Sequence, residues 1–574
     1  MKKDRWLAII IAVAALLSLI SGCGNSGSST ASAASADSAV PASEPEESAG
    51  QPETTEPDLE NSEAPEASVE PEPQEAENTI EYPISDEIVE ISLVTTVPPY
   101  MIDTLPDQDV GNISVFRASE EACGVNLEIT SLNFFTYAEE LNLLIAAQDL
   151  PDIINGLTAA YSSGAMGALE ENMCVDIMEY AEEYAPDFLK YYQENEVFRK
   201  ACTDDQGRVA AVHTAQEENY NISGLLLRAD YLEELGLEAP TTYDELESVL
   251  LAMTNAYDIQ YPAFFSGDVQ LGTLINGYGV DSNVYSVDEN GKVVYNMVTE
   301  QFKAYLTMLH KWFQEGLIDM DMLLNGTVSP GEMNAYVTNG RAAMVSGEAD
   351  FLSAASRALS EDENYDIIPI PDPTLEKNGT LRVGGDNGSS GVAGENGWSV
   401  NAVSDVIEEA ILYINWYWTE DGMLASNFGI EGEGYTFDND GNPVYTDLIL
   451  NNPNMSFAAA WKTYTSFQVP GLSWYKAVAA TFTDESQYTC ADTWSQKRST
   501  DGTFYGNLTT EENDAVSKYE TDLETLADER VLKFVVGDLN LESDWDAYVW
   551  DMETQGLNQC LETYQAAYDR YMEN

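Results

Sequence analysis

Residues 224–246 read Gly224-Leu-Leu-Leu-Arg-Ala-Asp-Tyr-Leu-Glu-Glu-Leu-Gly-Leu-Glu-Ala-Pro-Thr-Thr-Tyr-Asp-Glu-Leu246, and they indicate the fold class more strongly than any other part of the chain. The apolar run 225–227 predicts a buried strand, and residues 230–235 predict a short helix that a glycine closes. After a proline, Thr242 and Glu245 stand as N-cap and N3 of a capping box, so a second helix begins there. Strand and helices in this order are typical of a sheet covered by helices.

The same alternation occurs nearer the N-terminus. Residues 84–94 are rich in β-branched side chains and predict a buried first strand. Residues 136–148 predict an amphipathic helix, and Pro151 prevents its continuation before a strand that begins at Ile153. Strand, helix and strand at this spacing are the βαβ pattern of an open α/β sheet.

Two turns with Asn or Asp before Gly, at residues 288–292 and 438–442, predict β-hairpins. The second turn has a sharper alternative, a calcium loop. Thr436 and Asp447 stand where such a loop needs its first aspartate and its last glutamate, so the hairpin is the better prediction.

The chain begins with the features of an export signal. Lys2, Lys3 and Arg5 precede an apolar run from Trp6 to Ile20, which is short for a membrane span. Ile20-Ser-Gly-Cys23 then resembles a bacterial lipobox, in which the cysteine thiol carries the lipid. We expect residues 1–22 to be a lipoprotein signal peptide and Cys23 to be lipidated, for example with palmitate. The alternatives are an ordinary signal peptide or a short uncleaved anchor.

Residues 23–83 are expected to form a disordered acidic linker. They consist mainly of Ser, Ala, Glu and Pro, and no Lys or Arg occurs between Arg5 and Arg117. Such a segment cannot bury enough apolar surface to offset its ordering entropy. About 60 flexible residues would reach roughly 40–45 Å.

The bulk composition limits the class of ligand. The net charge is −76, from 24 basic and 100 acidic residues, which excludes a nucleic-acid partner because that needs a basic surface. It also disfavours a strongly anionic ligand unless a local basic pocket overrides the field. A chain of 574 residues exceeds what a single core holds, so we expect two lobes. Five cysteines remain beyond Cys23, with no C-x-x-C pair, and we expect mostly buried thiols.

The sequence holds no recognisable catalytic motif. There are two histidines, His213 and His310, and neither an H-E-x-x-H, a G-x-x-x-x-G-K-[ST] nor a G-x-S-x-G motif occurs. The glycine-rich run 384–394 has no following lysine for a phosphate. Carboxylate pairs for glycoside hydrolysis stay open, because acidic residues are too abundant to single one pair out. We therefore expect a protein without enzymatic activity, catalytic residues, cofactor or metal ion.

Several fragments together resemble one family, the extracellular solute-binding lipoproteins of carbohydrate ABC importers. They are Leu227-Arg-Ala-Asp-Tyr-Leu-Glu-Glu-Leu-Gly-Leu237 with Pro240-Thr-Thr-Tyr-Asp-Glu-Leu246, Asp149-Leu-Pro-Asp-Ile-Ile154, Trp312-Phe-Gln-Glu-Gly-Leu-Ile-Asp319, Gly429-Ile-Glu-Gly432, and the C-terminal Phe534-Val-Val-Gly537, Asp544-Trp-Asp-Ala-Tyr-Val549 and Tyr564-Gln-Ala-Ala-Tyr-Asp-Arg-Tyr571. Each is weak alone, but their order from about residue 85 to the C-terminus is specific. The subgroup most resembled is the large oligosaccharide-binding proteins, including alginate-type and LipO-like members.

The resemblance implies a two-lobed α/β fold of the type II periplasmic-binding-protein kind, with a hinge and discontinuous domains. Residues 84–220 and 392–432 would form the first lobe, and residues 221–391 and 433–574 the second.

A sugar-binding cleft needs aromatic faces and a few hydrogen-bonding side chains. The chain has 10 Trp, 32 Tyr and 17 Phe. The resemblance implies a stacking role for Trp474, and the expected ligand loops add Trp398, Tyr161, Tyr100 and Glu431, with Asp350 as a polar replacement where maltose-type proteins have a tryptophan. Core packing is the alternative for each aromatic residue.

The expected function is capture of an extracellular carbohydrate, most simply an oligosaccharide, by lobe closure and its delivery to ABC permease subunits. The protein would be a monomer, held at the outer face of the cell membrane by the lipid on Cys23. The alternatives are a surface-tethered polysaccharide-degrading enzyme and a peptide-binding receptor of the same fold.

Overall fold

The computed structural model describes residues 79–573 with short gaps. The gaps are residues 162, 218–221, 266–272, 281–282, 319–322, 324–329, 383–391, 456, 467, 483, 495–497, 500, 501, 503, 505 and 507. The chain divides into Met1–Glu75 and Ala76–Asn574, and every described residue belongs to the second unit. The expected signal peptide, Cys23, nearly all of the linker and most of the glycine-rich run therefore lie outside the described residues. Among the described helices, none is both long and apolar enough to cross a membrane.

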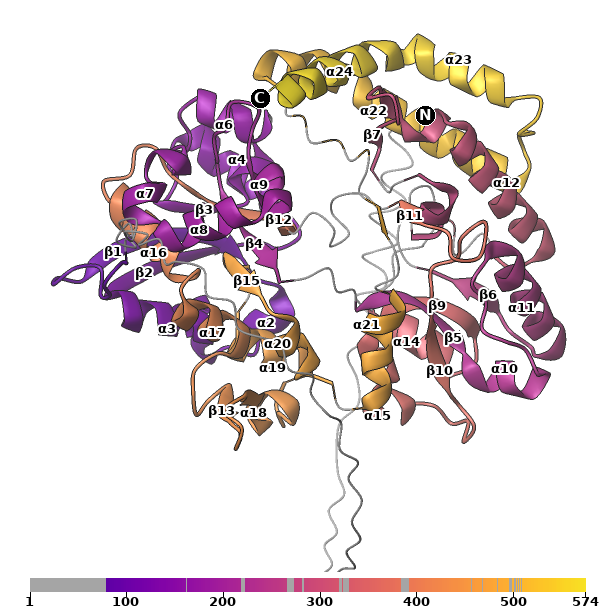
Figure 1. The fold of residues 1–574 in the computed structure, drawn as a ribbon, viewed down its shortest axis with the longest axis horizontal. Coiled ribbons are helices and arrows are strands. Elements are labelled where there is room, and N and C mark those ends of the chain that lie inside the picture. The colour runs from indigo at the N-terminus through magenta and orange to yellow at the C-terminus, as the bar shows by residue number, and fades with distance from the viewer. Residues whose placement is uncertain are drawn as a thin grey trace, which may run out of the picture. The chain divides into compact units, whose positions relative to one another are not determined.

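The first sheet has six strands in the order β15-β4-β12-β3-β1-β2 (Figure 1). Their bounds are β1 Val89–Thr96, β2 Val125–Leu132, β3 Ile153–Asn155, β4 Val212–Gln216, β12 Val392–Val400 and β15 Gly471–Ser473. Strand β1 pairs in parallel with β2 and β3, and β15 pairs in parallel with β4. Because β12 is antiparallel to both β3 and β4, all strands except β12 run in one direction. Their carboxyl ends therefore meet at one edge of the sheet.

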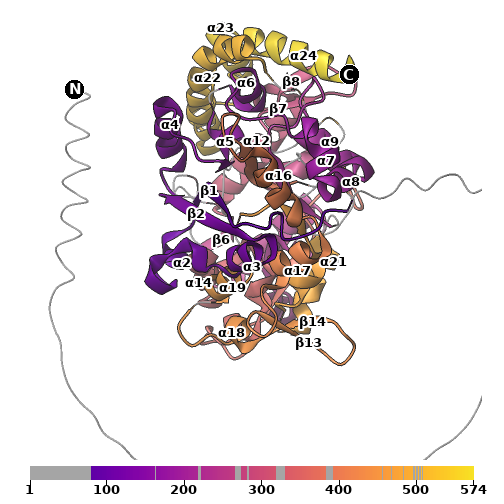
Figure 2. The same ribbon diagram turned by 90° about the vertical axis from the view of Figure 1, so that its left-hand side faces the viewer.

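Helices α3 (Ser114–Cys123) and α16 (Ile407–Trp416) pack with this sheet, and α16 lies towards the viewer in Figure 2. The buried core here includes Phe116, Phe188 and Tyr413. The predicted helix over residues 136–148 is confirmed as α4 (Tyr137–Ala147). The sequence pattern missed β2 and α3 between the first strand and this helix.

The second sheet has the order β10-β5-β9-β6. Its strands are β5 Ser223–Arg228, β6 Tyr261–Phe264, β9 Ala342–Glu348 and β10 Ile367–Ile370. Strand β5 is antiparallel to β9 and β10, whereas β6 is parallel to β9. The carboxyl ends of β6, β9 and β10 therefore share one edge.

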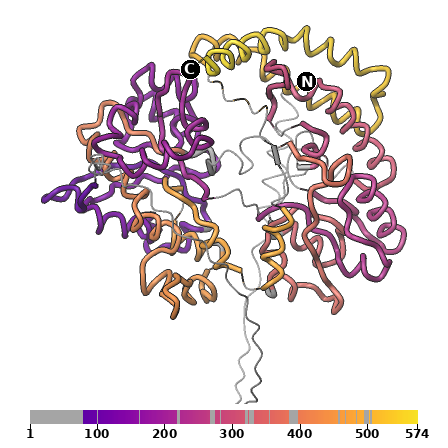
Figure 3. Tube along the Cα trace, in the orientation of Figure 1, coloured from indigo at the N-terminus to yellow at the C-terminus, as the bar shows by residue number. Residues whose placement is uncertain are grey.

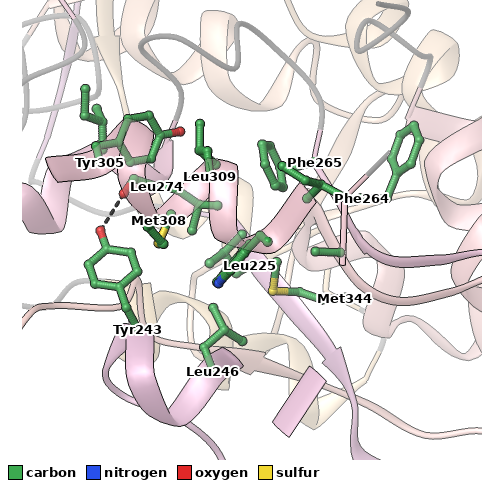
Figure 4. Packing of buried hydrophobic residues seen from close by; sticks show 14 of the residues in the cluster. Leu225, Tyr243, Leu246, Phe264, Phe265, Leu274, Tyr305, Met308, Leu309 and Met344 are labelled. Atoms are coloured by element: carbon green, nitrogen blue, oxygen red, sulfur yellow. Dashed lines mark hydrogen bonds between the residues drawn. The ribbon is translucent and has the colours of Figure 1, made fainter. Parts of the chain in front are cut away.

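The segment that begins at Gly224 forms β5 and two helices, α10 (Ala229–Leu235) and α11 (Tyr243–Ala256), as predicted. Gly236 closes α10 with a φ of +64°. The Thr242 hydroxyl accepts the Glu245 N–H at 3.3 Å, but the Glu245 carboxylate reaches Thr241 instead of Thr242. Figure 4 shows Leu225 and Leu246 packed with Met344 and Leu309 in the core of this half.

Four further helices belong to the second core: α12 (Glu300–Glu315), α22 (Thr510–Val536), α23 (Trp545–Gln555) and α24 (Leu557–Glu573). Helix α22 packs against the other three. Arg228 is 1% exposed, donates from Nε to Asp230 Oδ1 at 2.8 Å and lies over the Tyr231 ring. It is therefore a buried cation with a carboxylate and an aromatic ring as its partners.

The chain leaves the first half later than expected. Strand β15 pairs with β4, and helix α17 (Glu420–Phe428) lies beside β15, so the part of the chain between Gly432 and Ser473 stays with the first sheet (Figure 3). This pairing contradicts the expected third crossing between the two halves near Gly432. The reason is that β15 has only three residues and pairs with a strand more than 250 residues away, which no local pattern reports.

Both hairpins are confirmed, as β7–β8 (Tyr285–Val287 with Val293–Tyr295) and β13–β14 (Tyr435–Phe437 with Pro443–Tyr445). In the second turn Asp438 Oδ1 accepts the backbone N–H groups of Asp440 and Asn442 at 2.9 and 2.8 Å. This carboxylate therefore caps the turn, which is the hairpin alternative.

Candidate ligand-binding site

The carboxyl edge of the first sheet carries the segments that can contact a ligand. Val94 pairs with both Thr130 and Ile154, so strands β1, β2 and β3 end at similar heights. The segments that follow the strand ends are helix α2 (Pro99–Ile102), the loop 133–136, helix α5 (Leu157–Ala160) and helix α20 (Tyr475–Ala479). Ligands of open α/β sheets bind beyond such strand ends.

A cavity of about 350 Å³ lies beside the edge strand β15. This volume is within the range of small-ligand sites. Its polar lining consists of Thr214, Ser426, Asn427, Lys462, Thr465, Ser466, Gln468 and Ser473. The hydroxyls of Thr214, Ser426 and Thr465 donate to backbone carbonyls and keep lone pairs that can accept from a ligand. The Lys462 ammonium can donate, so the lining suits a ligand rich in hydroxyls.

Lys462 is the cationic group of this lining and lies on helix α19 (Phe457–Tyr464). Its Nζ is 4.3 Å from the centroid of the Trp461 ring. Within the described part of the chain, no ion pair involves this ammonium. Burial lowers the pKa of Lys462, and the Glu348 carboxylate opposes that effect by favouring the charged form.

The second sheet carries a carboxylate, Glu348, whose charge acts on this lysine, and a second one, Asp350, whose charge acts on Glu348. Glu348 ends β9, and Asp350 lies in the turn of 3₁₀ helix that follows. Solvent reaches both side chains, yet the surrounding protein removes enough water to raise the pKa of each carboxyl. Asp350 further raises the pKa of Glu348, and Lys462 lowers it. The carboxyl end of β9 thus carries two acidic residues, of which Glu348 interacts with Lys462 on α19 of the other half.

Trp474 lies at the N-terminus of α20, directly after β15. It is half-buried against Phe428, with ring centroids 6.4 Å apart, and its backbone N–H donates to Asn427 Oδ1 at 2.8 Å. Lys476 Nζ covers one ring face at 3.8 Å. The residue is therefore at the expected edge and next to the cavity-lining Ser473, although it does not itself line the cavity.

Trp398 is fully buried within the first core, where its ring lies beside Tyr413 and Tyr417. It offers no open face to a sugar, so core packing, the alternative interpretation, describes it. Its indole Nε1 donates to the Gln468 carbonyl at 2.9 Å, and Gln468 has a left-handed φ of +55°. Trp398 therefore positions a residue of the cavity.

The other expected residues are spread over the structure. Tyr100 lies in α2, next to α19, and Tyr161 follows α5 at the same sheet edge. The Tyr161 hydroxyl donates to Glu171 Oε2 at 2.7 Å, and burial with this carboxylate raises its pKa to about 12. Glu431 is exposed in the turn before β13 and is not part of the cavity lining.

Sequence reasoning missed Lys462, Gln468 and Glu348. Lys462 and Gln468 lie within residues 433–574, which the sequence predicts to belong to the second lobe. No sequence pattern therefore indicates that they lie near β4. A usable signal was the rarity of basic residues: with 24 among 574, a lysine beside a tryptophan in an apolar helix is unusual. For Glu348 the abundance of carboxylates removed any such signal.

Two separate α/β cores are typical of a bilobal solute-binding protein. A family model described as bacterial extracellular solute-binding protein matches residues 114–424, which is more than half of the chain. The chain belongs to this family, and the expected two-lobed α/β fold is confirmed.

Individual relatives agree with this assignment. The fructooligosaccharide ABC transporter substrate-binding protein FusA of Streptococcus pneumoniae serotype 4 is 22% identical over 82% of this chain and 89% of its own. Lipoprotein LipO of Bacillus subtilis is 24% identical over 62% of this chain and 70% of its own. A solved HMO-binding, ABC-transporter-associated solute-binding protein from Bifidobacterium longum infantis has a TM-score of 0.68, with 18% identity over 85% of this chain and 99% of that one. FusA and the structure from Bifidobacterium longum infantis are both named as substrate- or solute-binding proteins.

Proposed function

We propose that this protein is the substrate-binding lipoprotein of an ABC importer and captures an extracellular oligosaccharide. The observation that carries the proposal is the cavity at the carboxyl edge of the first sheet, lined by hydroxyls, amides and Lys462, with Glu348 and Asp350 at the corresponding edge of the second sheet. Such groups satisfy sugar hydroxyls from two sides. The names of FusA and of the HMO-binding structure support the same class of ligand.

The mechanism follows from the two cores. A ligand that contacts both halves binds the closed arrangement better than the open one, and so shifts the population towards closure. Permease subunits would then recognise the closed form and take up the ligand unchanged. Affinity comes from hydrogen bonds and ring contacts in the cleft, with no covalent step.

The membrane anchor is the lipid on Cys23 in this proposal, with the acidic linker as a tether and the monomer as the working unit. The name of lipoprotein LipO supports it. A Cys23→Ser variant expressed in a Gram-positive host should appear in the culture medium, whereas the unaltered chain stays with the membrane fraction. Equal membrane retention of both chains would contradict lipid anchoring.

The function is tested by calorimetry against a panel of oligosaccharides, with chromatography of the ligand after each titration. Binding with the ligand recovered intact supports the proposal. Shortened products would instead support the polysaccharide-degrading enzyme, for which Glu348 and Asp350, both with raised pKa, would be the first acids to replace. Absence of heat with every sugar would overturn the carbohydrate assignment and leave the peptide receptor.

A further inference from the structure

We infer that Phe134 and Phe135 form an aromatic subsite at the opposite end of the same sheet edge, so that the site takes an extended oligosaccharide instead of one or two sugar rings. This inference rests on the proposed function and specifies the length of its ligand.

The position of the pair follows from the topology. Phe134 and Phe135 lie in the loop directly after β2, which is one edge strand of the first sheet, whereas the cavity lies beside β15, the other edge strand. Six strands make five interstrand spacings of about 4.8 Å, so Ser473, the cavity-lining residue at the end of β15, is roughly 24 Å from the loop after β2, whereas Gln468 extends the cavity lining towards β3. A ligand that contacts both ends must be longer than a disaccharide.

The two rings are unusually accessible. Phe134 is 39% exposed and Phe135 is 80% exposed, and the rings form an edge-to-face pair with centroids 5.5 Å apart. Other large aromatic side chains of this half, such as Tyr413 on α16 and Trp398 on β12, are fully buried instead. A flat apolar face at a sheet edge can cover the C–H face of a sugar ring, which removes apolar surface of both from water.

Hydrogen bonds hold the loop that carries the rings. The Phe135 N–H donates to Asn133 Oδ1 at 2.9 Å, and the Asn133 N–H donates to Glu140 Oε2 at 3.1 Å. The Thr136 hydroxyl donates to the other oxygen of Glu140 at 2.9 Å. Because helix α4 thus fixes the loop on both sides, a ligand would not have to order it, and this lowers the cost of binding.

A chain of hydrogen bonds joins this loop to the cavity. The Tyr137 hydroxyl donates to the Asn155 carbonyl at the end of β3. Asn155 Nδ2 in turn donates to Gln468 Oε1 at 3.1 Å, and Gln468 lines the cavity. Asn155 is fully buried, so this link runs beneath the sheet edge and leaves the surface above it to a ligand. Hydrogen bonds within the protein therefore connect the loop of the aromatic pair to the cavity along one edge of the sheet.

The test is calorimetry of Phe135→Ala with fructo-, xylo- and galacto-oligosaccharide series, each as a disaccharide and a hexasaccharide. For the series that the unaltered protein binds, the variant should lose about 3- to 10-fold in affinity for the hexasaccharide, as expected of one aromatic contact, and nothing for the disaccharide. Trp550→Ala is the control, because Trp550 is 62% exposed but lies on α23 of the other half.

Unchanged hexasaccharide affinity, or equal losses for both lengths, would overturn the subsite. Unchanged affinities with impaired uptake into cells would overturn it as well and assign the pair to a permease contact. If the unaltered protein binds none of these series nor any other sugar, the proposed function itself fails, which is a result distinct from a failure of the subsite alone.

Discussion

Replacing Lys462 with methionine removes the cationic group of the cavity while keeping most of the apolar stem. Lys462 Nζ lies over Trp461 at 4.3 Å and lines the cavity. The matched control is Lys476→Met, because Lys476 also covers a tryptophan, Trp474, at 3.8 Å but is exposed and does not line the cavity. Any effect of losing a lysine–tryptophan contact should therefore be common to both variants.

The expected size follows from the kind of bond lost. A hydrogen bond from a charged donor contributes about 1.5–3 kcal/mol, which is roughly a 10- to 150-fold change in Kd. The upper part of this range is expected, because burial has already removed much of the water that could replace the ligand at Lys462. Lys476→Met should change Kd by less than about 3-fold, since an exposed cation–π contact contributes at most about 1 kcal/mol.

The dependence on pH gives a second readout with opposite signs for binding and stability. The pKa of Lys462 is lowered from its ordinary 10.5, so ligand affinity should fall as the pH rises through that lowered value, before 10.5 is reached. In the same interval the unfolded chain holds more protons at this site than the folded one, so the free energy of unfolding should rise with pH. Calorimetry and urea unfolding of the unaltered protein and of both variants measure these quantities. Equal affinity of Lys462→Met and the unaltered protein would show that Lys462 does not bind the ligand.

Three further predictions concern the stability of the fold. The Lys377 ammonium at 2.6 Å, with two hydrogen bonds from Thr241, lowers the pKa of Glu245 from 4.5 to about 2. Glu245→Gln should therefore lower the melting temperature at pH 7, and the difference should shrink as the pH falls from about 4.5 to 2. A difference independent of pH would contradict this. Leu250→Ala should cost about 2–5 kcal/mol in urea unfolding, because this leucine of α11 is fully buried, and a loss below about 1 kcal/mol would contradict the packing. Trp398→Phe should cost about 1–3 kcal/mol by the same measurement, because the Gln468 carbonyl loses its indole donor; unchanged stability would show that this bond is dispensable.

The local elements were predictable where one stretch carries its own signals. The strand, the two helices and their caps between Gly224 and Leu246 follow from apolar periodicity, a closing glycine and a capping threonine. Pairing between distant strands was not predictable, because β15 is too short to show a pattern and finds its partner β4 far back in the chain. The lobe boundary that the sequence predicts near Gly432 therefore precedes the point, after Ser473, up to which the chain still pairs with the first sheet.

The candidate site was predictable only in part for the same reason. The edge of the sheet followed from the order of strands and helices, and it does carry Trp474, Tyr100 and Tyr161. Composition cannot distinguish a buried tryptophan such as Trp398 from an accessible aromatic residue such as Phe135, since burial depends on which distant elements cover the ring. The structure supplies that information.

We expect an oligosaccharide to bind unchanged between the strand ends of the two sheets. A crystal structure of the protein with the tightest-binding oligosaccharide of the calorimetric panel tests this directly. It should show an intact sugar chain in contact with Lys462 on one side and with Glu348 or Asp350 on the other. A sugar bound elsewhere, or a ligand cleaved within the site, would contradict it.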